Sequence, residues 1–236
     1  FDGHTLENKG INDSQRKGIS MIHQEILIIP ELTVAQNIYL GREKEIAGSK
    51  FGWINDRLIN TKAKELLEHL RIEIDPTIKM KHLSVAQMQM VEIAKAISNE
   101  SKVLIMDEPT SAISDKEVAV LFDIIRDLKV RGVAIIYISH KMDEIFKISD
   151  TITVLRDGKY IGTKRANELD EKGLIKMMVG REIDHLFPDK EGTVGEVVLS
   201  TQNLGRNGKF NGIYLNVHEG EILGIAGLMG AGRTEV

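Results

Sequence analysis

Val103-Leu104-Ile105-Met106-Asp107-Glu108-Pro109-Thr110 is the stretch from which the rest of the chain can be interpreted. Four apolar residues lead directly into two carboxylates, and the proline that follows cannot donate a hydrogen bond to a neighbouring strand. A continuous apolar run closed by such a breaker is typical of a strand buried on both faces of a parallel sheet. The pattern predicts an α/β fold with a mainly parallel central sheet. It places Asp107 and Glu108 at the carboxyl end of a strand, where open α/β sheets bind their ligands.

Two adjacent carboxylates at that position can serve phosphoryl transfer. One can hold Mg²⁺, and the other can orient or deprotonate an attacking water. The alternative is a strand that ends in a solvated acidic turn, which Asp107 and Glu108 taken alone would favour. The remaining motifs decide between these interpretations.

Composition limits the classes of protein to consider. The 236 residues suffice for one large domain or two small ones. With 31 Lys and Arg against 35 Asp and Glu, the net charge is −4 and no basic run dominates, so nothing predicts a nucleic-acid partner. The chain has no cysteine, which excludes a disulfide framework and fits a reducing cytosol. No apolar run approaches the roughly 20 residues that span a bilayer. The start, Phe1-Asp2-Gly3, lacks an initiator Met and a signal-peptide pattern, so we expect a chain cut from a longer one.

Two further strands are predicted to end on polar side chains. Gly18–Gln24 alternates in polarity and ends on Gln24, and Val133–Ser139 is predicted as a second fully buried strand that stops at His140. Each polar residue alone is better explained as an ordinary turn or loop residue. Because a neighbouring strand ends in two carboxylates, His140 is expected to bring an imidazole near the same crevice.

Helix starts are marked by capping residues. Ser84 and Gln87 have capping-box spacing and open a predicted helix that runs to about Asn99. The box explains both residues structurally; the functional alternative is that the exposed helix N-terminus offers N–H groups to a phosphate. One helix start cannot decide between them. Other predicted helices follow the caps Thr33, Asn55 and Ser114.

The last quarter of the chain begins a new pattern. A hairpin over Thr151–Thr163 and a helix over Glu168–Val179 are followed by a charged, turn-rich linker at 181–195. The sequence therefore predicts a first domain at 1–180 and a second region at 196–236. Strands are expected in this region at Glu196–Leu204, Ile213–Val217 and Ile222–Ala226.

The third of these strands runs into a glycine-rich loop with the P-loop spacing GxxxxGK[ST], ahead of an expected helix. Glycines in such a loop let successive N–H groups curl around a phosphate, and Thr234 is placed to ligate Mg²⁺. Arg233 stands where the pattern has Lys, which keeps the charge but not the compact reach of an ammonium. A glycine-rich turn without phosphate is the less favoured alternative, because strand, glycines and hydroxyl agree. The predicted phosphate-binding residues are Gly227, Gly230, Ala231, Gly232, Arg233 and Thr234.

In their order, these motifs resemble those of ABC-transporter ATPases. Gln24 matches the Q-loop, Leu83–Gln87 the signature, Val103–Glu108 the Walker B strand, Ser111–Asp115 the D-loop and His140 the switch histidine. The amino-acid sequence from Leu83 to Ala96 is similar to the corresponding segment in the first half of the tandem ATPases of monosaccharide importers of the ribose, galactose and xylose type. The resemblance covers nearly the whole chain. It implies a P-loop NTPase fold with a helical subdomain and an antiparallel β subdomain, followed by the start of a second ATPase domain.

The resemblance also implies roles. Glu108 would be the general base, Asp107 would hold Mg²⁺ through water, and His140 would contact the γ-phosphate. Gln24 would sense the γ-phosphate, lie near the metal and signal to a membrane subunit. The signature residues expected to reach ATP on the P-loop of the opposite domain are Ser84, Val85, Ala86 and Gln87.

The implied function is an ATP- and Mg²⁺-dependent subunit that powers sugar import through membrane permease subunits at the inner face of the cell membrane. A sugar-binding protein would be an indirect partner. The alternatives are a soluble ABC ATPase without a membrane partner, and a fragment that does not hydrolyse ATP on its own.

Two departures from the family pattern stand out. The first domain lacks a P-loop of its own, and the glycine-rich tail could instead dock on it, within one chain or by self-association between two. Val85 and Ala86 replace the signature glycines, as Arg233 replaces the P-loop lysine. In the head-to-tail dimer of the family these replacements fall on one composite site, which we expect to bind nucleotide without efficient turnover.

Overall fold

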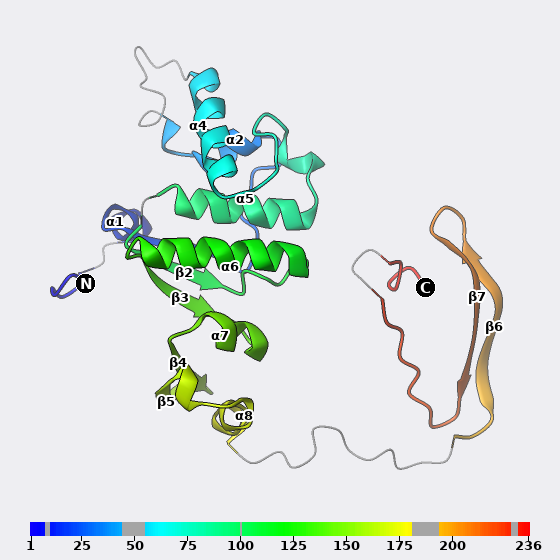
Figure 1. Ribbon diagram of the computed structural model, residues 1–236. Helices are drawn as coiled ribbons and strands as arrows, with labels where there is room; N and C mark the ends of the chain where they lie inside the picture. Colours follow the sequence, from blue (N-terminus) through cyan, green and yellow to red (C-terminus); the bar gives the residue numbers. More distant parts are fainter. Residues whose placement is uncertain (8–9, 44–54, 100, 181–193, 228–230) are drawn as a thin grey trace. The chain divides into compact units, whose positions relative to one another are not determined.

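The computed structural model describes the whole chain except residues 8–9, 44–54, 100, 181–193 and 228–230 (Figure 1). The chain divides into two compact units, Phe1–Arg181 and Glu182–Val236. The elements described in the first unit are α1 (Ile11–Arg16), β1 (Ile19–Ile22), α2 (Val34–Ile38), α4 (Asp56–His69), η1 (Met80–His82), α5 (Val85–Ile97), β2 (Val103–Asp107), α6 (Asp115–Val130), β3 (Ala134–Ile138), α7 (Met142–Ile148), β4 (Thr151–Arg156), β5 (Lys159–Arg165), η2 (Ala166–Glu168) and α8 (Glu171–Val179). The second unit contains β6 (Val197–Arg206) and β7 (Phe210–His218).

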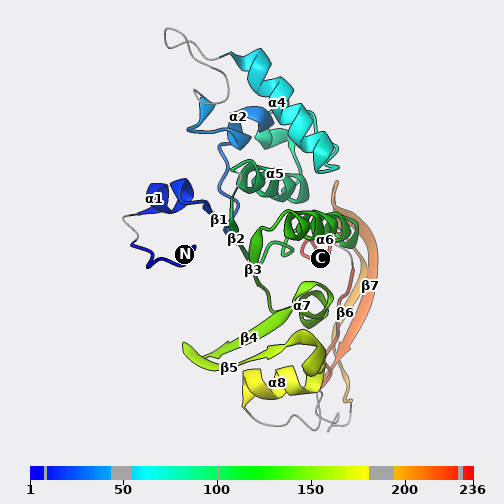
Figure 2. The same cartoon turned by 60° about the vertical axis from the view of Figure 1, so that its left-hand side comes forward.

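The centre of the first unit is a parallel sheet in the order β1-β2-β3. Alternate residues of β1 and β2 point into the core, and Ile22, Leu104 and Met106 are at most 1% exposed. Helices α5 and α6 lie on the same side of this sheet (Figure 2). They join α2 and α4 in one hydrophobic core. The predicted parallel sheet is confirmed.

The opposite face of the sheet is open, and this corrects the prediction that β2 and β3 are buried on both faces. Met21, Ile136 and Ile138 on that face are 41%, 52% and 45% exposed. Strand β2 alternates between buried and half-buried positions. An apolar run predicts burial only if elements pack on both faces, and no described element covers these three side chains.

The predicted helix starts are confirmed because capping is a local interaction. Thr33, Ser84 and Ser114 each form a complete capping box with the residue three positions later. The Asn55 side chain accepts from the backbone N–H of Leu58 at 3.2 Å and begins α4.

The β4–β5 hairpin and helices α7 and α8 form a second, smaller hydrophobic cluster around Ile152, Val154 and Leu174. Asp157 and Gly158 both have positive φ at the turn, as a tight hairpin of two antiparallel strands requires. Helix α8 starts at Glu171, three residues later than predicted, because the Asp170 side chain caps it through the Gly173 N–H at 2.9 Å.

In the second unit β6 and β7 pair in antiparallel fashion, as predicted. The third predicted strand, Ile222–Ala226, is wrong: this segment is extended without strand pairing to any described residue. Ile222 is 98% exposed and Ile225 is 56% exposed. A strand needs a neighbour that pairs with its N–H and C=O groups, and an apolar sequence does not supply one. Most of the predicted linker lies outside the described residues.

Candidate functional site

The parallel sheet brings four of the predicted site residues to one edge. Parallel strands end at the same edge, and here Ile22 of β1 is level with Met106, and Asp107 is level with Ile138 of β3. Gln24 therefore follows β1, Asp107 and Glu108 follow the apolar part of β2, and His140 follows β3, all at the carboxyl edge. We call this set the carboxyl-edge cluster.

Glu108 has an unusual backbone and a tightly held side chain. Its φ of 48° lies in the left-handed region, where a non-glycine residue costs about 1–2 kcal/mol. Its N–H donates to the Ile138 carbonyl at 3.0 Å, so the residue leaves the sheet only after its last ladder bond. The side chain is 15% exposed. Backbone strain of this kind persists only where surrounding contacts determine it, and it concentrates at functional sites.

His140 holds one oxygen of Glu108 and leaves the other free. The His140 backbone N–H and ring Nδ1 both contact Glu108 Oε1, at 3.1 and 2.8 Å. The carboxylate acceptor favours the tautomer that carries its proton on Nδ1. Glu108 Oε2 is buried and has no hydrogen-bond partner among the described residues. The His140 side chain is 73% exposed. The pair thus presents one unpartnered carboxylate oxygen beside an accessible imidazole.

Sequence reasoning missed a buried polar cluster behind this pair. Glu144 of α7 accepts hydrogen bonds from the hydroxyls of Thr110 and Tyr137, at 2.8 and 2.7 Å. In the sequence Asp143 and Glu144 are equivalent acidic residues in the first turn of a short helix. Their exposures separate them: the Asp143 side chain is 74% exposed and that of Glu144 is 5% exposed. No local pattern could have distinguished the two.

The carboxyl-edge cluster suits Mg²⁺ better than a metal held by protein alone. The described residues contain no group of three or more His, Cys, Asp and Glu side chains arranged to hold a metal ion. Mg²⁺ usually keeps several waters and takes one or two carboxylates together with substrate phosphates. Asp107, half-buried at the strand end, is the carboxylate of the cluster that could contribute to such a site.

The segment after Gln24 is anchored through its backbone while two of its apolar side chains face outward. Lys95 Nζ of α5 donates to the Leu27 carbonyl at 3.2 Å. The buried Asn37 amide accepts from the Ile29 N–H at 2.8 Å and donates to the Ile29 carbonyl at 3.1 Å. Leu27 and Ile29 are nevertheless 54% and 43% exposed. We call Leu27 and Ile29 the apolar pair.

The start of α5 is open to solvent. Ser84 Oγ accepts from the Gln87 N–H at 3.2 Å, and the Gln87 side chain accepts from the Ser84 N–H at 3.0 Å. As an acceptor in the cap, the Ser84 hydroxyl keeps its own proton to donate. Val85 is 52% exposed, and Ala86 is half-buried. Residues 84–87 therefore form a capped and exposed helix N-terminus. This geometry is compatible both with a purely structural cap and with phosphate binding.

The glycine-rich loop belongs to the second unit, and Gly230 lies outside the described residues. A Cβ on Gly227 would come within 3.2 Å of Ala231 Cβ and 3.3 Å of Arg233 Cγ, so the loop folds closely back on itself. Gly232 has a φ of 84°, which favours glycine. Arg233 and Thr234 lie in a turn and are exposed. The predicted strand before this loop is absent from the described residues, and the phosphate-binding role of the loop stays a prediction.

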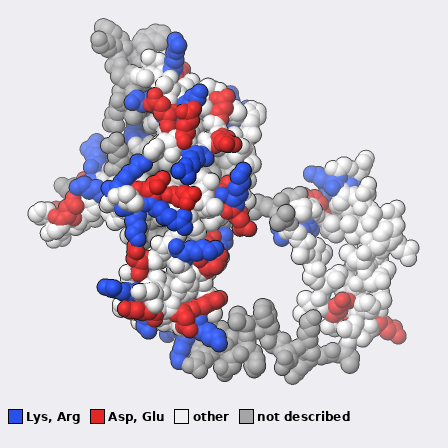
Figure 3. All heavy atoms as spheres, viewed as in Figure 1, with Lys and Arg blue, Asp and Glu red and all other residues white. Residues whose placement is uncertain are grey.

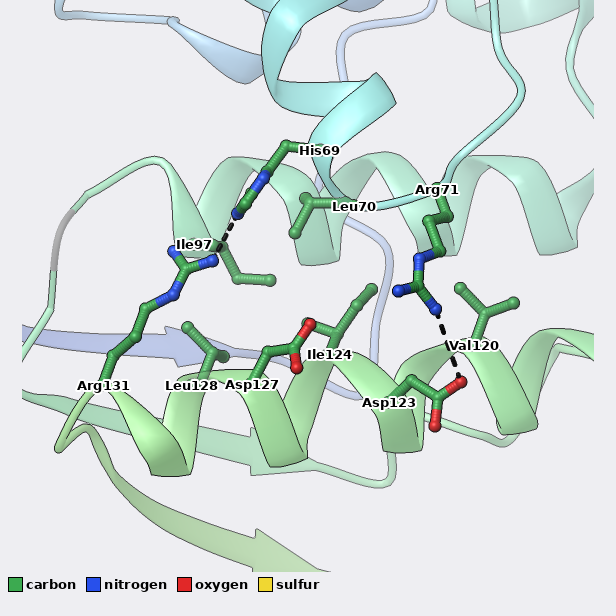
Figure 4. Close-up of a pocket in the computed structure, with 10 residues that line it drawn as sticks. All are labelled: His69, Leu70, Arg71, Ile97, Val120, Asp123, Ile124, Asp127, Leu128 and Arg131. Carbon is green, nitrogen blue, oxygen red and sulfur yellow. Dashed lines mark hydrogen bonds and ion pairs between the residues drawn. The ribbon is translucent and has the colours of Figure 1, made fainter.

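A small cavity elsewhere in the first unit is unrelated to the predicted site. It has a volume of about 90 Å³ and lies between the end of α4 and α6. Arg131 donates a hydrogen bond to the His69 ring across it (Figure 4). Arg71 Nη1 forms an ion pair with Asp123 Oδ2 at 3.9 Å. None of the predicted site residues lines it. In one view of the surface, Lys and Arg are interspersed with Asp and Glu over the first unit (Figure 3).

Comparisons with known proteins agree with this geometry. The ABC transporter family profile matches residues 1–111. A nucleotide-free ATP-binding cassette from an ABC transporter superposes with a TM-score of 0.60 at 25% identity, covering 77% of this chain and 72% of that chain. The ADP conformation of another such cassette gives a TM-score of 0.58 at 24% identity, covering 77% and 76%. A protein of Geobacillus kaustophilus, named for ribose/galactose/methyl galactoside import and ATP binding, is 54% identical over 236 residues. The chain belongs to the ABC-transporter ATPase family.

The relatives of this ABC ATPase chain are about twice as long. The match to the Geobacillus protein extends over 100% of this chain and 46% of that protein. A protein of the same name from Halalkalibacterium halodurans, also 54% identical, matches 100% of this chain over 45% of its own length. A Rhizobium meliloti protein with that name is 52% identical over 99% of this chain and 45% of its own length. The chain thus spans about half the length of these curated relatives. The predicted family and fold class are confirmed, and none of the described helices is long and apolar enough to cross a membrane.

Proposed function

We propose that this ABC ATPase chain contributes to ATP binding and hydrolysis in a subunit that powers monosaccharide import. The observation that carries the proposal is the Glu108–His140 pair, which holds one carboxylate oxygen and leaves the other unpartnered at the sheet edge. The names of the 52–54% identical relatives support the sugar-import part.

In the proposed reaction Glu108 is the general base. Its Oε2 is free to accept a hydrogen bond from a water and to take its proton, while Oε1 stays on His140. Burial of the carboxylate limits competing solvent contacts. His140 would keep Glu108 in place through Nδ1, and its Nε2 would donate to the γ-phosphate only when the ring carries a proton on both nitrogens. Catalysis of this type depends mainly on positioning and charge stabilisation.

Asp107 and Gln24 are the residues of the first unit that would hold Mg²⁺ beside a nucleotide, and Thr234 is the residue of the glycine-rich loop that would hold Mg²⁺ beside a nucleotide bound there. Bound there, the ion would neutralise part of the phosphate charge. Asp107 and Gln24 belong to the carboxyl-edge cluster, whereas Thr234 belongs to the glycine-rich loop. We assign residues 1–180 to a first ATPase domain, 181–195 to a linker and 196–236 to the start of a second.

The signature and the glycine-rich loop are both proposed to be degenerate. The signature residues are Ser84, Val85, Ala86 and Gln87, and the residues of the loop that would hold nucleotide are Gly227, Gly230, Ala231, Gly232, Arg233 and Thr234. The exposed Val85 side chain occupies the first turn of α5, where a glycine would let a phosphate approach the backbone N–H groups. Arg233 cannot reproduce the compact contact of a lysine ammonium. We expect restoration of glycine at 85 and 86 and of lysine at 233 to raise ATP turnover in a protein of the relatives' length.

The apolar pair supports a membrane permease as partner. Leu27 and Ile29 expose apolar side chains on a backbone fixed by Lys95 and Asn37, so docking would require little ordering. They follow Gln24 directly, which would connect the nucleotide site to the permease. The chain would then act in the cytoplasm, peripheral to the inner face of the membrane. A sugar-binding protein would supply the permease from the other side.

The test is ATP hydrolysis by a protein of the relatives' length that contains these 236 residues, with and without Glu108→Gln. We expect the variant to lose roughly 10²–10⁴-fold in kcat, the usual contribution of a general base, while its Kd for ATP stays the same. Glu65→Gln, an exposed change of the same chemistry on α4, is the matched control and should retain full activity. A Glu108→Gln variant that hydrolyses ATP within a few-fold of the parent would contradict the proposal.

A further inference from the structure

Glu144 is a buried carboxylate to which the proposed mechanism gives no role. It lies in the first turn of α7, the helix that follows β3 along the chain (Figure 1). It is 4% exposed, in contrast to its neighbour Asp143. A buried carboxylate is costly unless it is paired and hydrogen-bonded, so its partners determine what it does.

The partners of Glu144 satisfy both of its oxygens. Oε2 accepts from Thr110 Oγ1 at 2.8 Å and from the Tyr137 hydroxyl at 2.7 Å, with Ser139 Oγ at 3.5 Å. Oε1 pairs with Lys141 Nζ at 3.1 Å. Burial raises the pKa of the Tyr137 hydroxyl, and the Glu144 carboxylate beside it raises that pKa further. The phenol is thus a persistent donor to an anionic acceptor.

These partners come from the two segments that carry the proposed catalytic pair. Thr110 is two residues after Glu108, and Lys141 directly follows His140. Lys141 Nζ also donates to the Thr110 carbonyl, at 3.2 Å, and so joins the two segments a second time. Glu144 therefore connects the turn after β2 to the loop after β3 from behind, on the side away from solvent.

The connection through Glu144 would maintain the strained backbone conformation of Glu108. A left-handed glutamate relaxes unless neighbouring contacts over-determine its conformation. Among the described residues, the Glu108 side chain is hydrogen-bonded only to His140, whose own side chain is 73% exposed. The contacts of Glu144 are buried, whereas the His140 side chain is open to solvent.

We infer that Glu144 is a positioning residue that sets the geometry of Glu108 and His140 through Thr110, Tyr137 and Lys141. The catalytic consequence rests on the function proposed above. The geometric consequence does not, because it concerns only the Glu108–His140 hydrogen bond of this chain.

The first arm of the test measures that hydrogen bond directly in the 236-residue chain. Long-range ¹H–¹⁵N spectra of histidine rings distinguish a proton on Nδ1 from one on Nε2, and the His140 signal is assigned by its loss in His140→Gln. We expect the Nδ1–H form in the parent and a mixture of both tautomers in Glu144→Gln, as in Glu108→Ala, which removes the acceptor. Asp143→Asn removes the same charge from the same turn of α7 and should leave the signal unchanged.

A purely structural role gives a different result. Glu144→Gln would then lower the melting temperature but leave the His140 tautomer as in the parent, and that outcome overturns the inference. If Glu144→Gln does not fold, Tyr137→Phe removes one donor and keeps the charge. A smaller shift of the His140 signal in the same direction supports the inference, and an unchanged signal overturns it.

The second arm measures steady-state ATP hydrolysis in a protein of the relatives' length. Misplacement of a catalytic group by about 1 Å costs on the order of 10²-fold, so we expect kcat to fall roughly 10- to 100-fold in Glu144→Gln with KM changed less than about two-fold. Equal effects on kcat and on KM would contradict a positioning role. A parent protein without ATPase activity would refute the proposed function alone, because the tautomer measurement still decides the role of Glu144.

Discussion

The carboxyl-edge cluster and the glycine-rich loop were both predicted from sequence motifs, yet they differ in what holds them in place. Asp107 and Glu108 follow a strand paired on both sides, and Glu108 is fixed by His140 and by a buried network behind it. The glycine-rich loop follows an extended segment, Ile222–Ala226, without a strand partner among the described residues.

The difference teaches that a motif specifies chemistry but not the frame that supports it. At the carboxyl edge, the parallel ladder places side chains from separate parts of the sequence side by side. In the glycine-rich loop, only the close return of Arg233 onto Gly227 and the positive φ of Gly232 remain of the expected geometry. These features are local, whereas a strand or a buried side chain needs partners from elsewhere in the chain.

The largest expected effect is a difference in the free energy of unfolding between side-chain truncations in β2 and in the segment before the glycine-rich loop. Leu104→Ala removes a side chain that is 1% exposed in β2, and such truncations cost about 2–5 kcal/mol. Ile225→Ala, before the glycine-rich loop, removes one that is 56% exposed, and exposed substitutions stay within about 0.5 kcal/mol. Chemical denaturation measures both. Similar losses for the two variants would show that the segment before the loop is as well packed as β2.

A second prediction concerns the anchor of the apolar pair. Asn37→Ala removes a fully buried amide that bonds to both the N–H and the carbonyl of Ile29, and we expect a cost of about 1 kcal/mol, since the Ile29 backbone is only partly buried. Asn60→Ala, on the more exposed α4, should be neutral or slightly stabilising because alanine favours helix. We expect the same order in binding to membrane vesicles that contain the permease. Unchanged stability in Asn37→Ala would mean that water replaces the amide and that the segment is not rigidly anchored.

A third prediction separates the cap at Ser84 from phosphate binding. Ser84→Ala should cost about 1 kcal/mol in the free energy of unfolding, the usual value of an N-cap. Ser84→Asp keeps a capping oxygen and should hold stability, but it places a negative charge where a phosphate would approach. Weaker ATP binding in Ser84→Asp alone, measured in a protein of the relatives' length, would show that the helix start contacts nucleotide. Unchanged ATP binding would make it a cap only.

The smallest effect is a pH dependence at Glu92, which pairs with Lys95 at 3.1 Å. Burial raises the pKa of Glu92 above 4.5, and the attraction of Lys95 offsets only part of this. Because the folded pKa is the higher one, the stabilisation is fully present below pH 4.5 and is lost as the pH rises through the folded pKa. Relative to Glu92→Gln, the parent should therefore lose stability as the pH rises through that window. A difference between the two that does not vary with pH would exclude this assignment.

Sequence predicted those parts of the molecule that are set locally or by strand order. Capping boxes at Thr33, Ser84 and Ser114 were predictable because each involves residues three apart. The meeting of Glu108 with His140 was predictable because parallel strands share an edge.

The remainder depends on distant partners. The apolar run of β3 gave no sign that one face would stay open, since burial depends on what covers it. Similarly, nothing in the local sequence distinguishes Glu144 from Asp143, and only Glu144 meets partners from other segments, Thr110 and Tyr137.

Amide hydrogen exchange of the chain without nucleotide tests the central contrast most directly. The N–H groups of Glu108 and His140 are hydrogen-bonded, to the Ile138 carbonyl and to Glu108 Oε1, and should exchange slowly. The N–H groups of Leu223, Gly224 and Ile225 should exchange at nearly the rate of an unfolded peptide. This result would establish a preformed catalytic edge and an unsupported glycine-rich loop in the same chain. Rapid exchange at Glu108 and His140, or protection across 222–226, would contradict the account.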